Sequence, residues 1–369
     1  MAPAAIVPAV LTEEELARSL APLGEATMLP AAAYTSREVL AWELRLLFAG
    51  TWTCLGRRGD LFPCGATQRC VPAGDVSVLL TQTGGEVVAL ANTCRHRGHE
   101  LLPDGATAGR DAVVCPYHAW AYRLDGTLRG APGLADADGL DLVRLPAVTW
   151  HDWVFVNATG DAGPFADHVG AMAGLVAAYA PERLVRAARH DYTVAANWKV
   201  IVENYHECYH CPMIHPELCA VSPPASGDNY DLPGAWVGGA MDLREHAETM
   251  SLDGRSNGAF IDGVDRRRVL YLGLLPNLLV SAHPDYVMTH LLWPLAPGRT
   301  RVECSWYAPG GDASHAVEFW DRTNRQDWTA CESVQRGLAS PHFRPGPFTA
   351  REDAVHRWVT MIARAYRGS

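Results

Sequence analysis

The chain has 369 residues, 48% of them apolar, and a formal net charge of -10. A chain of this length and composition can bury a sizeable core and is expected to form two or three domains. The negative charge, with no basic run longer than Arg266–Arg268, argues against a nucleic-acid partner. No apolar stretch approaches the roughly 20 residues that a membrane span requires.

The N-terminal segment and the number of cysteines indicate the cellular compartment in which the protein is expected. The opening segment MAPAAIVPAVLTEEELARSL has no basic region before its apolar part, so no secretory signal is expected and a cytoplasmic location is predicted. Ten cysteines are too sparse for a disulfide scaffold in a chain of this size. Free thiols or metal ligands are therefore expected.

Three regions of different character follow one another along the chain. Residues 35–50, TSREVLAWELRLLFAG, predict a helix, because leucines recur on one stripe and a glycine ends the run. Residues 51–157 consist of short apolar runs separated by Gly, Asp and Pro turns, which predicts a compact all-β domain. Beyond Gly160 helical patterns return, followed by strand-like runs within residues 269–308 and a helical segment from about His315. An α+β layout is expected.

Two cysteine–histidine pairs lie inside the predicted β domain. CRHRGHE contains Cys94-x-His96, and CPYHAW contains Cys115-x-x-His118. Two thiolates and two imidazoles can hold tetrahedral zinc or a [2Fe-2S] cluster. The single residue between Cys94 and His96 favours the cluster, because zinc sites usually space such a pair by about two to four residues. The two pairs, with Trp120 after the second, resemble the Rieske cluster motif.

The segment NYHECYHCPMIH, residues 204–215, is compatible with two different metal sites. His206, Glu207 and His210 form the H-E-x-x-H pattern of zinc peptidases, in which the histidines bind zinc and the glutamate is the general base. The extended form of that pattern would place a third histidine one residue after His215. The second interpretation groups Glu207 and His210 with His215 itself, which suits iron.

A helix from Trp198 to His210 is predicted, with Asn197 as its cap and a proline after its end. Helical spacing then puts Glu207 and His210 on one stripe. His215 can turn back toward them because the helix has stopped.

Iron(II) in a facial triad needs two histidines and one carboxylate. In residues 315–338 an apolar stripe passes through Trp320 and Cys331, and Asp327 lies where a hydrophobic residue is expected. A buried carboxylate is costly unless it is paired or bound to metal. Asp327 is therefore a candidate third ligand, and the alternative is that it is a solvated acid like Asp321.

The run from Asn197 to His215 and the later segment QDWTACESVQRG resemble the oxygenase (alpha) component of Rieske non-haem iron oxygenases. The resemblance assigns catalytic roles to Glu207 and Asn204 and makes His206 incidental. In that family, Glu207 would hydrogen-bond across a head-to-tail trimer to His118 of the partner subunit. The metal ligands that it implies are Cys94, His96, Cys115 and His118 for a [2Fe-2S] Rieske cluster, and His210, His215 and Asp327 for mononuclear Fe(II).

The same resemblance implies an α+β fold class with three parts. Residues 1–50 would be an N-terminal helical segment that packs on the catalytic domain. Residues 51–160 would be an all-β Rieske [2Fe-2S] domain. Residues 161–369 would be a helix-grip (SRPBCC, Bet v 1-like) catalytic domain with an antiparallel sheet.

The short E-N-x-x-E spacing from Glu203 to Glu207 and the segment FWDRTNRQDW resemble one branch of the family. That branch acts on quaternary ammonium compounds: glycine betaine, carnitine, choline and stachydrine. It implies a homotrimer, a separate flavin/iron-sulfur reductase that uses NAD(P)H, and O2-dependent hydroxylation or oxidative N-demethylation. A Rieske hydroxylase of another small or aromatic substrate is the alternative, and an electron-transfer Rieske protein and a zinc peptidase are remote ones.

A permanent cation is best held by aromatic faces, each contact contributing about 0.5 to 2 kcal/mol. Several side chains between the expected iron ligands are candidate pocket walls: Trp236, Tyr271, Tyr286, Trp293 and Trp306, with Met241, Met250, His283 and His290 equally open.

Overall fold

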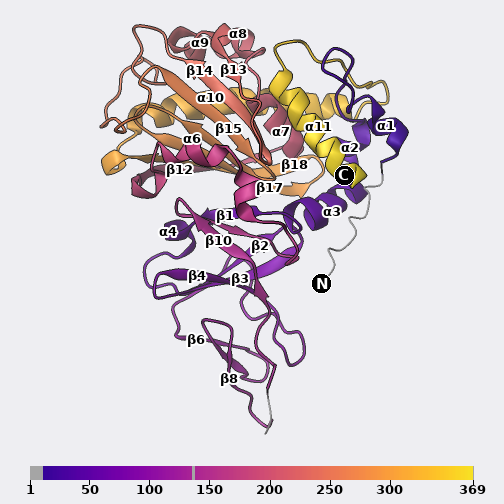
Figure 1. Ribbon diagram of the computed structural model, residues 1–369, viewed down its shortest axis with the longest axis vertical. Coiled ribbons are helices and arrows are strands. Elements are labelled where there is room, and N and C mark those ends of the chain that lie inside the picture. The colour runs from indigo at the N-terminus through magenta and orange to yellow at the C-terminus, as the bar shows by residue number, and fades with distance from the viewer. Residues whose placement is uncertain (1–10, 135–137, 369) are drawn as a thin grey trace. The chain divides into compact units, whose positions relative to one another are not determined.

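The computed structural model describes residues 11–134 and 138–368 (Figure 1). The chain forms two compact units. One unit spans Glu43–Phe165, and the other combines the N-terminal segment that ends at Trp42 with the chain from Ala166 onward. Among the helices of the described residues, none has the length and apolar character of a membrane span.

The unit Glu43–Phe165 is built from antiparallel strands, which confirms the all-β expectation for this region. Its sheets have the strand orders β1-β11-β10, β5-β2-β3-β4-β9 and β6-β7-β8. Its elements are η1 (Leu44–Phe48, a π-helical turn), β1 (Thr53–Arg57), α4 (Arg58–Leu61), β2 (Gln68–Ala73), β3 (Val76–Thr83), β4 (Glu86–Ala91), β5 (Thr107–Ala108), β6 (Ala112–Val114), β7 (Ala121–Arg123), β8 (Leu128–Gly130), β9 (Arg144–Leu145), β10 (Ala147–Trp150) and β11 (Trp153–Val156).

The second unit contains one antiparallel sheet with the strand order β12-β18-β17-β16-β15-β14-β13. Strands β13 to β18 are neighbours in the order in which they follow one another in the sequence, so they form a meander. Strand β12 pairs with β18 at one edge of the sheet. Its strands are β12 (Val185–Val194), β13 (Asp228–Asn229), β14 (Trp236–Asp242), β15 (Arg268–Leu274), β16 (Leu278–Ala282), β17 (Val287–Ala296) and β18 (Arg299–Ala308).

The helices of this unit pack against the sheet and against one another (Figure 1). Helix α7 contacts β17, α10 contacts α7 and β12, and α11 contacts α7 and β14. The helices are α1 (Glu13–Ala17), α2 (Ala31–Thr35), α3 (Arg37–Glu43), α5 (Phe165–Val169), α6 (Met172–Ala177), α7 (Trp198–Tyr205), α8 (Cys211–Ile214), α9 (Pro216–Val221), α10 (Ser314–Leu338) and α11 (Asp353–Arg367). This arrangement confirms the expected α+β class.

Helix α7 is shorter than its sequence predicts. Asn197 caps it as expected, because its side chain accepts a hydrogen bond from the backbone N–H of Lys199. The helix ends at Tyr205, however, and not at His210. The carboxylate of Glu207 accepts from the backbone N–H groups of Tyr209 and His210, which a continuing helix would have paired with carbonyls one turn earlier. The predicted common helical stripe of Glu207 and His210 is therefore wrong.

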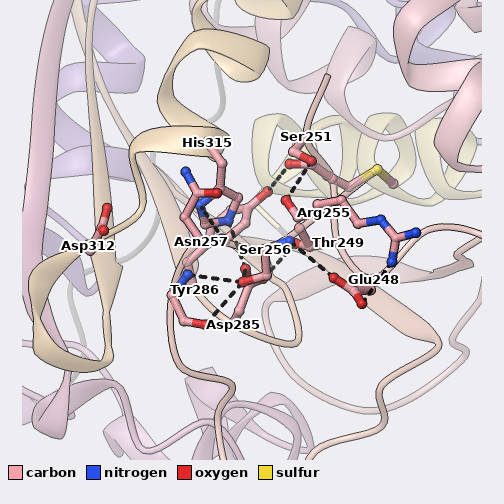
Figure 2. Close-up of polar contacts among 12 residues, drawn as sticks. Glu248, Thr249, Ser251, Arg255, Ser256, Asn257, Asp285, Tyr286, Asp312 and His315 are labelled. Atoms are coloured by element: carbon pink, nitrogen blue, oxygen red, sulfur yellow. Dashed lines mark hydrogen bonds and ion pairs between the residues drawn. The ribbon is translucent and has the colours of Figure 1, made fainter. Parts of the chain in front are cut away.

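The long connection between β14 and β15 is held by one buried carboxylate (Figure 2). Asp285, just before β17, accepts hydrogen bonds from the hydroxyls of Thr249 and Ser256, each at 2.5 Å. Nε2 of His315, at the start of α10, lies 2.8 Å from the same carboxylate. Burial alone would raise the pKa of Asp285, but these hydrogen bonds hold it below its ordinary value of 3.8.

Candidate functional site

Two loops in the first unit bring the predicted cluster ligands together. The thiols of Cys94 and Cys115 are buried at 2% exposure, whereas His96 and His118 are exposed. The two imidazole rings lie 4.6 Å apart. This distribution, with thiols inside and imidazoles outside, fits a cluster in which cysteines bind one iron and histidines the other.

The two loops have the same local structure. The N–H of Gly98 donates to the carbonyl of Cys94 at 3.0 Å, and the N–H of Ala119 donates to the carbonyl of Cys115 at 3.1 Å. Both turn residues have positive φ, 71° at Gly98 and 57° at Ala119. The same turn therefore follows the cysteine in both loops, although the histidine follows it by two positions in one loop and by three in the other.

Neighbouring groups tune the cysteines. Burial raises the pKa of the Cys115 thiol above 9.0, so a thiolate here needs a positive partner such as an iron ion. The hydroxyl of Tyr122 lies 3.3 Å from Sγ of Cys94 and accepts from the N–H of Arg95 at 3.1 Å. With its lone pair engaged by this N–H, the hydroxyl can direct its own proton at the sulfur.

The second constellation brings together His210, His215 and Asp327. The two Nε2 atoms are 3.1 Å apart, and Oδ1 of Asp327 lies 2.9 Å from Nε2 of His215 and 3.4 Å from Nε2 of His210. Three ligands that bind one metal in adjacent positions at about 2.1 Å are separated by roughly 3 Å. The spacing therefore fits one ion.

The hydrogen bonds of the Nδ1 atoms determine which ring nitrogen of His210 and of His215 carries the proton. Nδ1 of His210 donates to Oε1 of Glu207 at 2.5 Å, and Nδ1 of His215 donates to Oε1 of Gln326 at 2.7 Å. Both Nε2 lone pairs consequently face the carboxylate of Asp327, and a cation best satisfies such a group of acceptors. Burial alone would lower the pKa of His210, but the neighbouring carboxylates of Asp327 and Glu207 raise it to about 9, which shows the same preference for positive charge.

The structure contradicts the zinc-peptidase interpretation. His206 does not belong to the ligand group, whose atoms lie within 4.8 Å of one another. Its Nε2 is buried without a hydrogen-bond partner among the described residues, and burial lowers its pKa to about 3. A Cβ atom at Gly273 would come within 2.3 Å of this nitrogen. His206 is thus a buried residue at the wall of the neighbouring cavity, outside the ligand group, and the missing side chain of Gly273 leaves room for its imidazole.

Asp327 lies on α10 where the sequence pattern places it. Its side chain is only 16% exposed, so it is not a solvated acid. Burial alone would raise its pKa, but the two adjacent histidine side chains lower it. The apolar stripe is interrupted further on, however, since Val334 is 43% exposed.

The expectation of free thiols is wrong for two of the ten cysteines. A disulfide joins Cys208 and Cys211 on either side of His210, in the turn that follows α7. The remaining cysteines among the described residues are free. The sequence separation of three residues allowed this pairing, but only the bend after Tyr205 brings the two side chains together.

A cavity of about 570 Å³ adjoins the group of His210, His215 and Asp327. Its aromatic lining residues are Tyr205, Tyr209, Tyr271, Trp320 and Trp328, and Asn204 and Glu207 also line it. Tyr271, Met241 and His290 are pocket residues, as their candidacy allowed. The other proposed walls are not among the lining residues: Trp236, Tyr286, Trp293, Trp306, Met250 and His283.

The sequence did contain a signal for one missed wall. Trp320 precedes Asp327 by seven residues, which is about two helical turns, so both side chains share one face of α10. Outside the pocket, Tyr286 holds this tryptophan: its hydroxyl accepts from Nε1 of Trp320 at 2.7 Å and donates to the carbonyl of Met250 at 3.0 Å. Figure 2 shows Tyr286 beside the Asp285 carboxylate.

A Rieske-type ligand set in one unit and a two-histidine, one-carboxylate set beside a cavity in the other define a class, the iron-dependent oxygenase subunits. The chain belongs to the ring hydroxylating alpha subunit family: the catalytic-domain profile of that family matches residues 181–368, and the Rieske [2Fe-2S] domain profile matches residues 51–146. It is therefore an oxidoreductase, and its cofactors are a [2Fe-2S] cluster and a mononuclear iron.

Similar proteins agree with this family. The chain is 28% identical to the glycine betaine monooxygenase oxygenase subunit of Chromohalobacter salexigens, with 87% of this chain and 81% of that one covered. It is 35% identical to the carnitine monooxygenase oxygenase subunit of Escherichia coli K12 over 52% of this chain and 53% of that one. The fold matches that of the quaternary ammonium Rieske monooxygenase CntA with a TM-score of 0.78 at 24% identity, covering 98% and 100% of the two chains.

Proposed function

We propose that the chain is the oxygenase component of a Rieske monooxygenase that hydroxylates or N-demethylates a small quaternary ammonium compound, with glycine betaine as the first candidate. The observation that carries this proposal is the cavity beside His210, His215 and Asp327, which combines aromatic walls with an excess of acidic side chains. The names of the curated relatives, which are glycine betaine, carnitine and choline monooxygenases, support the same substrate class.

The cavity suits a permanent cation. Tyr271, Trp320 and Trp328 offer ring faces or edges, and a quaternary ammonium group has no N–H with which to use ordinary acceptors, so aromatic faces are its best partners. Among the described part of the chain, the lining aspartates, glutamates, lysines and arginines are Glu207, Asp228, Asp327 and Asp353 with Arg351. Bound iron would offset Asp327, which leaves three carboxylates against one guanidinium. This charge balance favours a positively charged or zwitterionic substrate over an aromatic acid.

Two sets of residues would hold the cofactors. His210, His215 and Asp327 would bind the mononuclear iron, and the cluster ligands would be Cys94, His96, Cys115 and His118. When bound, the two centres together supply electron delivery and O2 activation. The chain itself orients the ligands through Glu207 and Gln326 and presents the substrate through the aromatic walls.

For an N-methyl substrate, the proposed reaction inserts one oxygen atom of O2 into a C–H bond and reduces the other to water with two electrons and two protons. The resulting N-hydroxymethyl group breaks its C–N bond to release formaldehyde, a proton and the demethylated amine. The aromatic walls would limit the access of water to the cation during this step.

The electron path is also part of the proposal. Glu207 would accept a hydrogen bond from His118 of the partner subunit in a homotrimer, and Asn204, on the last turn of α7, would support the same route as a neighbouring lining residue. The electrons would come from NAD(P)H through a separate flavin/iron-sulfur reductase. One solved CntA structure is described as revealing inter-subunit electron transfer, which supports this arrangement.

A substrate screen tests the proposal. The purified protein, loaded with iron and supplied with a surrogate reductase, is offered glycine betaine, carnitine, choline and a set of aromatic acids. Formaldehyde release and substrate-dependent NADH oxidation are measured. We expect coupling with one or more quaternary amines; coupling restricted to aromatic acids would reject the substrate class while leaving the family intact.

A further inference from the structure

The two histidines of the ligand group are held by different kinds of acceptor. His210 donates from Nδ1 to the carboxylate of Glu207, whereas His215 donates from Nδ1 to the neutral carboxamide of Gln326 at 2.7 Å. The side chain of His215 is 2% exposed, so water does not compete effectively for this nitrogen. Gln326 directly precedes Asp327 on α10.

The amide group of Gln326 has a fixed orientation. On its other side lies Glu217, whose pKa is held below its ordinary value chiefly by a backbone hydrogen bond and to a smaller extent by the side chains of Arg322 and Gln326. Because a carboxylate can only accept, the amide NH2 group is the end of Gln326 directed toward it. Glu217 is in turn paired with the guanidinium of Arg322 at 3.2 Å. The chain from Arg322 through Glu217 and Gln326 to His215 therefore leaves Oε1 facing the imidazole.

We propose that Gln326 is a positioning residue of the iron site: its Oε1 keeps the proton of His215 on Nδ1 and directs the Nε2 lone pair toward the shared centre with Asp327. This inference rests on the proposed ligand set. Groups that accept the second N–H of a histidine ligand typically change metal affinity by about 10- to 100-fold when they are removed.

The neutral amide acceptor of Gln326 also determines how basic the imidazole of His215 is as a metal ligand. A carboxylate acceptor pulls the Nδ1 proton more strongly and makes the imidazole a more basic ligand, as Glu207 does for His210. An amide leaves His215 close to a neutral imidazole. The site therefore contains one strongly and one weakly polarised histidine, and a change of acceptor at Gln326 should alter affinity and reduction potential in opposite ways.

The test measures iron binding, not turnover. Gln326→Leu removes the acceptor at similar size. Gln326→Glu combined with Glu217→Gln retains an acceptor toward His215 and a donor behind it, and avoids two adjacent carboxylates. Thr329→Leu is the matched control, because Thr329 is exposed on the same helix. Each variant is prepared as the full chain with its cluster, stripped of mononuclear iron and reloaded with Fe(II) in competition with a chelator.

We expect Gln326→Leu to bind Fe(II) about 10- to 100-fold more weakly, with an unchanged Rieske absorption spectrum and thermal midpoint. The double variant should bind at least as tightly as the wild type and have a lower Fe(III)/Fe(II) potential, and Thr329→Leu should match the wild type. Wild-type affinity in Gln326→Leu would overturn the proposal, as would equal loss in the double variant. His215→Ala separates the two hypotheses: if it retains iron, the ligand set itself is wrong.

Discussion

Removal of one hydroxyl outside the cavity should loosen a cavity wall. Tyr286→Phe leaves the ring in place but removes the acceptor of the Trp320 indole N–H and the donor to the Met250 carbonyl. Both groups are buried, and each unpaired buried group costs about 1 to 3 kcal/mol. We therefore expect a loss of about 2 to 6 kcal/mol in unfolding free energy, a large part of the stability of a typical domain.

The same change should weaken substrate binding. If Trp320 turns away from the cation, one aromatic contact of about 0.5 to 2 kcal/mol is lost, which corresponds to a KM about 2- to 30-fold higher. The value of kcat should change little, because the proposed iron ligands are untouched. A neutral analogue with a tert-butyl group in place of the trimethylammonium group should show a much smaller change in inhibition constant, because it makes no cation–π interaction with Trp320.

Urea unfolding and steady-state kinetics on quaternary amines measure these effects. Tyr192→Phe is the matched control: its hydroxyl donates to Asp321, the residue after Trp320 on α10, at 2.6 Å, but Tyr192 does not line the cavity. It should change stability and leave KM alone. A Tyr286→Phe protein whose KM is unchanged, or changes equally for the cation and the neutral analogue, would refute the reasoning.

Three further predictions concern single polar groups. Glu207→Gln should keep its iron, because an amide oxygen can still accept from His210, but its steady-state turnover should fall by orders of magnitude. Iron analysis with single-turnover and steady-state assays checks this, and normal turnover would exclude the proposed hydrogen bond between Glu207 and His118 of the partner subunit. Tyr122→Phe should lower the cluster reduction potential, because hydrogen bonds to the sulfurs stabilise the reduced, more negative state; an unchanged potential in protein-film voltammetry would show that the hydroxyl does not reach Cys94. Because the pKa of Asp285 is below its ordinary value of 3.8, its ionised form stabilises the fold at pH values above 3.8, and this stabilisation is lost as the pH falls through the depressed pKa. The unfolding free energies of wild type and Asp285→Asn should therefore converge at low pH, and a difference that stays constant with pH would contradict this prediction.

The local sequence identified the two groups of candidate metal ligands that the structure brings together. The cluster loops need only short-range turns, so the spacing of Cys94, His96, Cys115 and His118 specified them. Asp327 was visible because a carboxylate interrupts an apolar helical stripe, and such a group must be paired when buried. These signals depend on neighbouring residues and helical periodicity, which a sequence contains directly.

The end of α7 needed the tertiary structure. Residues 198–210 have a helical pattern throughout, and no local rule states that Glu207 will capture the N–H groups of Tyr209 and His210. That side-chain competition decides which histidine joins the ligand group. It brings His215 to Asp327 and leaves His206 in the core against Gly273, a contact with a distant strand.

The cavity walls also depended on how the strands pair and which face the helices cover. Side chains alternate between the two faces of a strand. Trp293 is three residues after the lining residue His290 on β17 and so points to the opposite face. Trp236 pairs with Leu274, which likewise lies three residues from Tyr271. The sequence contains this alternation, but only the strand register and the packing of α7 and α10 select the face that becomes the cavity, because that choice is made by contacts between segments far apart in the chain.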